Sequence, residues 1–117
     1  MNFLIKLLIT ALAVVISSYL LPGVEVDSFF TAVIIGAVLA LLNVTLKPLL
    51  IILTIPATIF TLGLFLLVVN AVIILVADWL VTGFYVDGFW WALGFSLILW
   101  IVNTILQDMG GTKKKTN

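Results

Sequence analysis

The sequence predicts an all-α integral membrane protein whose four transmembrane helices form a duplicated helical hairpin. Of its 117 residues, 65% are hydrophobic and only 9% are charged, whereas a soluble domain is about half apolar and about a quarter charged. A soluble core of this size could not hide so much apolar surface, so lipid is the expected solvent. The second observation is an internal repeat, because residues 20–46 recur as residues 80–106.

The two copies share glycine, aspartate and asparagine, which are informative in a chain rich in leucine. Apart from leucines, the identical pairs, each sixty positions apart, are Gly23 and Gly83, Val26 and Val86, Asp27 and Asp87, Phe29 and Phe89, Ala32 and Ala92, and Asn43 and Asn103. Each copy consists of an apolar segment, a short acidic turn and a second apolar segment. This order indicates two copies of one transmembrane hairpin.

Four spans are expected, at residues 3–21, 29–46, 62–82 and 89–107. Each has about the 20 residues that cross a bilayer, and in lipid the backbone must satisfy its own polar groups, so these spans are helices. The turns at 22–28 and 83–88 contain helix-breaking proline and glycine. We expect one membrane domain over 1–109, with repeats at 3–46 and 62–107, followed by a flexible basic tail at 110–117.

The linker at 47–61 is apolar after Lys47 and contains Pro48 and Pro56. It is too short to cross once the flanking spans have taken their residues, and segments of this length are typically re-entrant or interfacial. We therefore expect Pro48 to stop the second helix, and a short helix to lie on or dip into the cytoplasmic face. The alternative is that the second span continues through the linker with a proline kink.

The lysines predict the orientation. Lys6, Lys47 and the run at 113–115 all fall on one side if both termini are cytoplasmic, as the positive-inside rule requires. The first span completes the first repeat, so we interpret it as an uncleaved anchor and not a signal peptide. Two hairpins separated by an even number of crossings share one orientation, and are therefore related by an axis along the membrane normal.

One polar side chain occupies a similar depth in each predicted helix. This intramembrane polar layer consists of Thr10, Asn43, Asn70 and Asn103. The first interpretation is structural, with amides that bond across helices and contribute roughly 0.5–2 kcal/mol each. The second is a polar ring that lines a water path or a ligand site; such a ring is uncharged and would discriminate poorly between ions.

Charged residues are expected at the two membrane boundaries. Lys6 and Lys47 are candidates for contact with lipid headgroups at the cytoplasmic interface, or serve only as orientation signals. Asp27 and Asp87 precede helices in the outer turns and are candidate helix caps, with a cation site between the turns as the alternative. Asp78 is expected at the outer interface, and would relay protons only if it were buried.

Small residues recur at helical spacing on the second and fourth spans. Such residues let helix backbones approach closely. The predicted packing positions are Ala32, Gly36, Ala40, Ala92 and Ser96.

The composition argues against an enzyme. The chain lacks cysteine, histidine and arginine, which removes thiolate ligands, the commonest general base and bidentate phosphate clamps. No nucleophile–base pair, phosphate loop or metal cluster is apparent. We therefore expect no cofactor, no metal, no nucleic acid and no soluble substrate.

Four stretches carry a family resemblance: LPGVEVDSFFTA, LALLNVTLKPLL, TLGLFLLVVNA and GFYVDGFWWAL. Together they resemble the bacterial phage holin family 4 membrane proteins, of the mycobacterial four-TMS phage holin type, superfamily IV. The most specific pieces are Asn-x-x-x-Lys-Pro at 43–48 and Thr-Leu-Gly-Leu-Phe at 61–65. The resemblance implies a small four-helix protein of the bacterial cytoplasmic (inner) membrane.

These observations favour a non-enzymatic, holin-like protein that acts through assembly in the bacterial envelope, with membrane lipid and further copies of itself as partners. Two alternatives remain. A pore-forming or lesion-forming holin would make the membrane leaky when overproduced. A lipid or small-molecule transporter would produce a substrate-dependent flux without general leakage.

Overall fold

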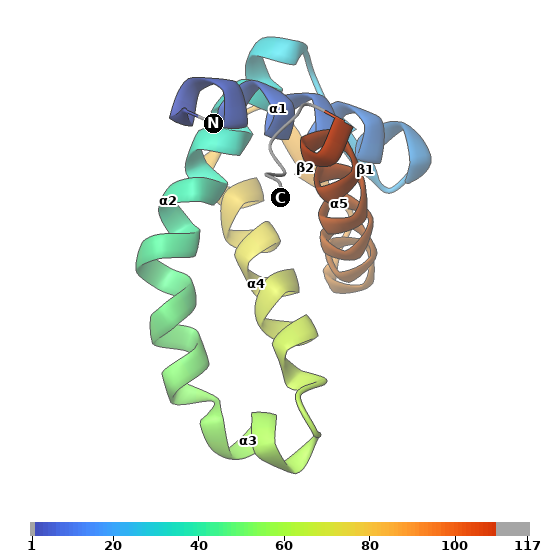
Figure 1. Ribbon diagram of the computed structural model, residues 1–117. Helices are drawn as coiled ribbons and strands as arrows, with labels where there is room; N and C mark the ends of the chain where they lie inside the picture. Colours follow the sequence, from blue (N-terminus) through green and yellow to red (C-terminus); the bar gives the residue numbers. More distant parts are fainter. Residues whose placement is uncertain (1, 110–117) are drawn as a thin grey trace.

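The computed structural model describes residues 2–109 as helices joined by tight turns. The predicted basic tail, with its lysines at 113–115, lies outside the described residues. In chain order the elements are α1 (Phe3–Leu20), β1 (Val24–Val26), α2 (Phe29–Leu53), α3 (Ile55–Phe60), α4 (Phe65–Leu80), β2 (Phe84–Val86) and α5 (Phe89–Met109) (Figure 1). Helices α1, α2 and α5 are long and apolar enough to cross a membrane, and α4 is a shorter apolar helix of 16 residues.

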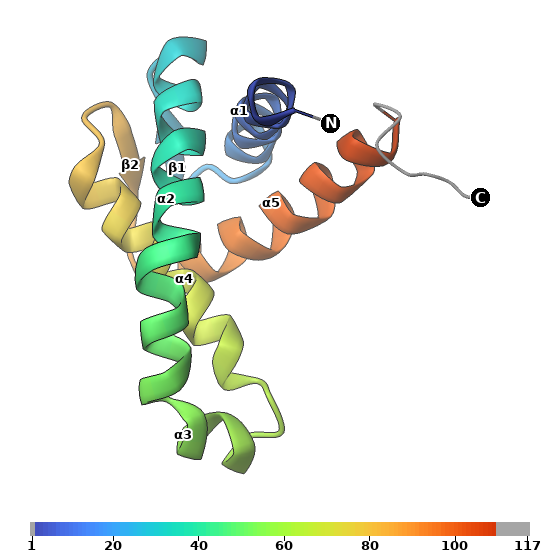
Figure 2. The same ribbon diagram turned by 60° about the vertical axis from the view of Figure 1, so that its left-hand side comes forward.

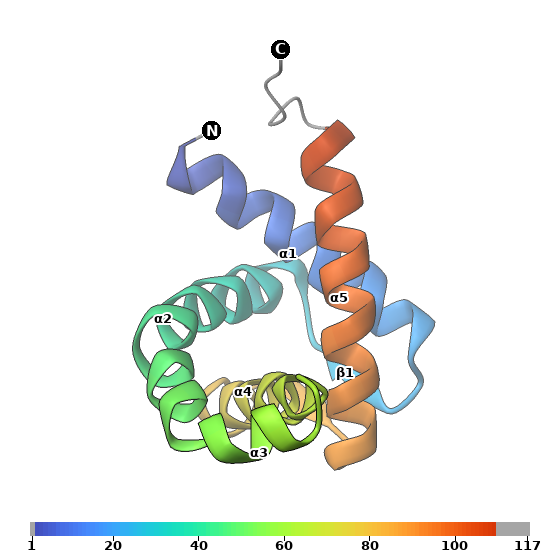
Figure 3. The same cartoon turned by 60° about the horizontal axis from the view of Figure 1, so that its bottom comes forward.

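The helices form two arms that diverge from a shared region beside the strands. Helices α2 and α4 lie side by side and are joined by α3 at the far end of their arm (Figures 1 and 2). Helices α1 and α5 form the second arm, in which the start of α1 and the end of α5 lie toward the same side (Figure 3). Contacts of α1 with α2 and of α4 with α5 join the two arms.

Two short strands, which the sequence did not predict, tie the turns together. Strands β1 and β2 pair antiparallel with Glu25 opposite Tyr85 at their centre. The Asp27 N–H donates to the Gly83 carbonyl at 3.0 Å, and the Asp87 N–H donates to the Gly23 carbonyl at 2.8 Å. Backbone polar groups of each turn thereby pair with those of the other.

The buried core lies where the arms meet, and its positions recur at intervals of sixty residues. Ala11, Val14 and Ala32 are fully buried. Of their counterparts, Ala71 and Ala92 are fully buried and Ile74 is nearly so. Phe84 of β2 packs its ring against Phe95 of α5, with ring centroids 5.7 Å apart. The pair anchors the strands on the helices, since both rings are buried.

Helix α2 corrects the expectation that Pro48 stops the second helix. It continues through Lys47 and Pro48 to Leu53, over 25 residues, which corresponds to about 37 Å. Proline lacks an N–H, so only the Val44 carbonyl loses its helical donor, and transmembrane helices tolerate such a gap. The alternative, in which the second span continues through the linker, holds only as far as Leu53, because the six residues of α3 form a separate helix.

The cap of α2 is Ser28, whose hydroxyl accepts a hydrogen bond from the Thr31 N–H at 3.2 Å. The prediction that Asp27 caps this helix is therefore wrong: α2 begins at Phe29 as expected, and Ser28, the residue directly before it, is the cap. Asp87 instead uses its backbone in the strand-to-turn bond with Gly23, and its role as a cap of α5 stays a prediction.

Candidate functional site

Three of the predicted polar residues line one cavity of about 170 Å³ between α2, α4 and α5. Asn43, Asn70 and Asn103 each come from a different helix, and Lys47 and Trp100 also border the cavity. These residues are far apart in the sequence, and the crossing of the arms brings them together.

A hydrogen bond between α1 and α5, the two helices of the second arm, connects Thr10 to these asparagines. The Asn103 Nδ2 donates to the Thr10 Oγ1 at 3.5 Å, which is at the long limit for such a bond. The Gln107 Nε2 donates to the Asn103 Oδ1 at 3.2 Å. Gln107 was missed by the sequence analysis, although its position one helical turn after Asn103 was a usable signal.

Asn43 differs from the other amides in depth and exposure. Because α2 ends at Leu53, Asn43 lies ten residues before the helix end, which corresponds to about 15 Å. Its side chain is exposed, whereas Asn70 and Asn103 are half-buried. Asn43 therefore lies further from its helix end than the predicted span 29–46 implied, and it is more exposed than the other two amides.

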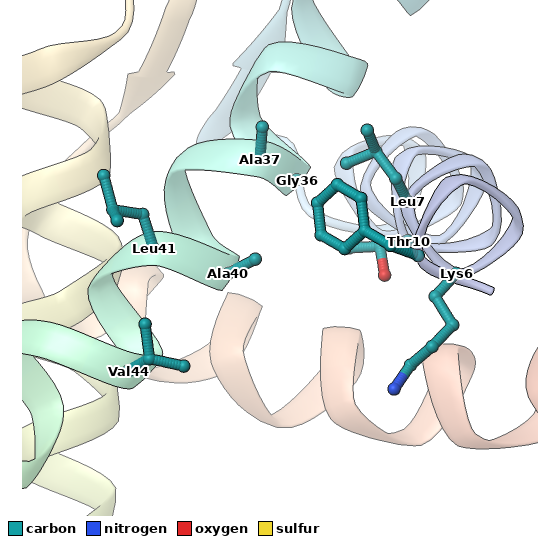
Figure 4. Close-up of a pocket in the computed structure, with 9 residues that line it drawn as sticks. Lys6, Leu7, Thr10, Gly36, Ala37, Ala40, Leu41 and Val44 are labelled. Atoms are coloured by element: carbon teal, nitrogen blue, oxygen red, sulfur yellow. The ribbon is translucent and has the colours of Figure 1, made fainter.

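A larger groove of about 560 Å³ lies between α1 and α2 (Figure 4). It is lined from α1 by Phe3, Lys6, Leu7 and Thr10, and from α2 by Gly36, Ala37, Ala40, Leu41 and Val44. The two helices are in close contact at Gly36, where a Cβ atom would lie 3.2 Å from the Leu7 Cδ1. From this contact the groove extends toward Phe3 and Val44.

The predicted small residues fall into two groups. Ala32, Gly36 and Ala92 are buried between helices. Ala40 borders the groove, and Ser96 borders the polar cavity, where its hydroxyl donates to the Leu93 carbonyl at 2.9 Å. Small side chains at these two positions thus leave space and do not close a helix contact.

The two predicted interface lysines border different spaces. Lys6 is exposed on the wall of the groove, with its ammonium directed away from α1 and toward α5 (Figure 4). Lys47 is half-buried beside the polar cavity. Their contact with lipid headgroups stays a prediction.

The half-buried carboxylate of Asp78 has a structural partner in the turn. Its Oδ2 accepts a hydrogen bond from the Val86 N–H at 3.1 Å, which ties β2 to α4. This partner could not be expected without the strand. Within residues 2–109, no three acidic side chains are grouped so that they could hold a metal ion.

Comparison with known proteins places this architecture in a family. The family model described as Mycobacterial 4 TMS phage holin, superfamily IV, matches residues 1–105. The uncharacterized protein SCO3922 of Streptomyces coelicolor is 36% identical, over 92% of this chain and 97% of its own length. The uncharacterized membrane protein YvlD of Bacillus subtilis is also 36% identical, over 88% of this chain and 87% of its own length.

No solved structure matches the chain. The family match spans nearly all of the described residues, and both relatives align over most of their lengths. The chain is a membrane protein that belongs to the Mycobacterial 4 TMS phage holin family, superfamily IV.

Proposed function

We propose that the protein is a non-enzymatic component of the bacterial inner membrane that acts by assembling with further copies of itself. The observation that carries this proposal is the exposed Asn43 amide near the middle of α2. Asn43 borders the polar cavity, but its side chain is exposed, and an amide at that depth is costly where it meets lipid. A second copy of the chain would supply the missing polar partner.

The proposed arrangement in the membrane is a duplicated hairpin with both termini in the cytoplasm. It is supported by the strand register, in which the repeat partners Glu25 and Tyr85 face each other. It is also supported by the reciprocal bonds Asp27 to Gly83 and Asp87 to Gly23. Both features are those expected of two copies related by a two-fold axis, which we place along the membrane normal.

Helix α3 then lies at the cytoplasmic headgroup boundary. The end of α3 and the turn after it carry apolar side chains that are almost fully exposed, with Phe60 90% and Leu62 93% accessible. Exposed aromatic and aliphatic side chains at a membrane boundary are favourable when they insert into the headgroup region.

Thr45 shows why Asn43 in particular needs a partner. Both residues are exposed on α2, and they lie two positions apart, on nearly opposite faces of the helix. The Thr45 hydroxyl donates to the Leu41 carbonyl of its own helix at 2.7 Å, so it can face lipid at little cost. The larger Asn43 amide has two N–H donors and a carbonyl, which its own helix cannot satisfy together.

Cross-linking in native membranes tests the assembly. The chain contains no cysteine, so Asn43→Cys introduces a unique thiol, and the disulfide traps a dimer covalently even where loss of the amide weakens the assembly. We expect oxidation to produce a disulfide-linked dimer for Asn43→Cys, and none for the matched control Thr45→Cys at the same depth. Equal cross-linking of the two variants, or none for either, would contradict assembly through the Asn43 face.

A pore is the second candidate, and the shared cavity favours it. Asn43, Asn70 and Asn103 all border one polar space, so an assembly through Asn43 would bring several such spaces together. We expect liposomes that contain the purified protein to stay as tight as empty ones. Ion flux that changes in Asn103→Leu would favour the pore instead.

A further inference from the structure

We propose that the groove between α1 and α2 binds one anionic phospholipid, with an acyl chain between the helices and the phosphate on the Lys6 ammonium. The proposal rests on the membrane orientation proposed above, which puts Lys6 in the cytoplasmic leaflet. It adds a defined ligand site, which assembly alone would not require.

The shape of the groove suits an acyl chain. At about 560 Å³ it lies within the usual range of ligand pockets, roughly 300–1,000 Å³. Its walls are apolar apart from Lys6 and Thr10, and three of its apolar residues, Phe3, Leu41 and Val44, are strongly exposed. A lipid chain would cover these side chains without forming any new polar contact.

The charge of the groove selects the headgroup. Lys6 is the cation among the lining residues, and its ammonium extends from the groove wall (Figure 4). A lysine on a flexible stem can keep its charge at the headgroup level while its methylenes line the groove. The cytoplasmic leaflet is rich in anionic lipid, which an ammonium at that level attracts.

The second half of the chain provides an internal comparison. At the positions sixty residues later, Leu66 replaces Lys6, Leu97 replaces Ala37 and Trp100 replaces Ala40. The cavity that Trp100 borders there is about 170 Å³ and is lined by amides. The first half thus combines small side chains with a cation, whereas the second half has bulky side chains and no cation at the equivalent positions.

The charge of the groove argues against the chain's own C-terminal segment as the occupant. That segment carries the lysines at 113–115, which Lys6 would repel. A phospholipid matches both the apolar walls and the charge, whereas a helix of a second copy would match the walls alone.

Native mass spectrometry of the full-length protein in detergent tests the proposal. The probes are phosphatidylglycerol and phosphatidylcholine with identical acyl chains. We expect one tightly bound phosphatidylglycerol per chain, and at least tenfold weaker retention in Lys6→Leu. Ala40→Trp, which copies the second half, should release both lipids, and Ala37→Leu provides a second filled groove if the tryptophan variant does not fold.

The controls separate the lipid from other occupants. Lys47→Leu removes a cation outside the groove and should leave retention unchanged, and glycerol phosphate should not compete with the lipid. Equal retention of the two lipids, loss in Lys47→Leu but not in Lys6→Leu, or competition by glycerol phosphate would each overturn the proposal. So would a change of oligomeric state in Ala40→Trp without a change in bound lipid, since the groove would then hold a second copy.

The lipid site and the assembly can fail separately. Cross-linking of Asn43→Cys should persist when Lys6→Leu is added, because Asn43 borders the other cavity. Loss of lipid retention with intact cross-linking would support the site alone, whereas intact retention without cross-linking would reject the assembly and keep the site.

Discussion

The first half of the chain, through α2, and the second half, from α4 onward, bury matching positions but differ in the side chains where the arms diverge. Ala11 and Ala71, and likewise Ala32 and Ala92, are fully buried. Where the arms diverge, however, the first half has Ala40 beside a groove and the second half has Trp100 beside a polar cavity. The two halves thus share a pattern of buried positions, while the side chains around the opening give each half its own surface.

The paired glycines of the two turns are identical in type but differ in backbone conformation. Gly83 has a φ of +93°, a conformation in which other L-residues are strained, whereas Gly23 does not have a positive φ. A Cβ atom on Gly23 would overlap the ring of Trp91. The same residue type is therefore required at matching positions for two different reasons.

Among substitutions that test the difference between the two halves, we expect the largest loss of stability at Gly23. Gly23→Ala should lower the free energy of unfolding by about 3 kcal/mol, at the upper end of overpacking costs, because the methyl group has to displace the Trp91 ring. Thermal unfolding in detergent measures the loss. Adding Trp91→Leu should recover part of the stability of Gly23→Ala but none of that lost in Gly83→Ala, whose backbone is strained; equal rescue of both would contradict the distinction.

The next largest effect is expected at Gly36. Gly36→Leu should lower the free energy of unfolding by about 2 kcal/mol, because the added side chain meets Leu7 of α1. Gly36→Ser, which copies Ser96 of the second half, should cost clearly less. Both are compared by thermal unfolding and by size in detergent. If Gly36→Leu has the same unfolding temperature as the wild type, α1 and α2 do not make the close contact at Gly36.

The paired asparagines should respond differently although their sequence context matches. Asn103→Leu removes the bonds to Thr10 and Gln107 and should lower the free energy of unfolding by about 1 kcal/mol. Asn43→Leu should change it by less than about 0.5 kcal/mol, as is usual for exposed positions, and should weaken the assembly instead. Unfolding of the monomer and sedimentation of the oligomer separate the two effects, and equal destabilisation by both variants would argue against this assignment.

The smallest effect is a gain of stability. Ser17 is fully buried, and its hydroxyl has no hydrogen-bond partner among residues 2–109. The second half has Ala77 at the equivalent position. Ser17→Ala should therefore raise the free energy of unfolding by up to about 1 kcal/mol, with Ser18→Ala as the neighbouring control. A loss of stability in Ser17→Ala would show that the hydroxyl has a partner.

The sequence was sufficient for the positions of the helices and for the residues that approach the polar cavity. Hydropathy sets where helices lie, and the repeat places Asn43 and Asn103 at equivalent points. It was insufficient where a local signal competes with tertiary packing. Pro48 is a strong local breaker in water, but α2 runs through it, as transmembrane helices can where their surroundings satisfy the freed backbone group.

The strands and the open arms could not be predicted for a related reason. Three-residue strands such as 24–26 carry no periodicity of their own, and they exist because two distant turns meet. The angle between the arms depends on side-chain packing at the crossing, and that angle decides whether Asn43 is enclosed or exposed. Gln107 was missed because a single amide near a helix end is common on exposed surfaces.

The central claim is that the two halves lie in the membrane with the same orientation. Single cysteines in this cysteine-free chain, read with a membrane-impermeant maleimide on intact spheroplasts, test it directly at four exposed positions, Glu25, Phe60, Tyr85 and Asp108. We predict labelling from outside at residues 25 and 85, and protection at residues 60 and 108. The critical helix is α4, because its 16 residues span only about 24 Å. Protection of residue 85 together with labelling of residue 108 would mean that α4 does not cross, and would contradict the claim.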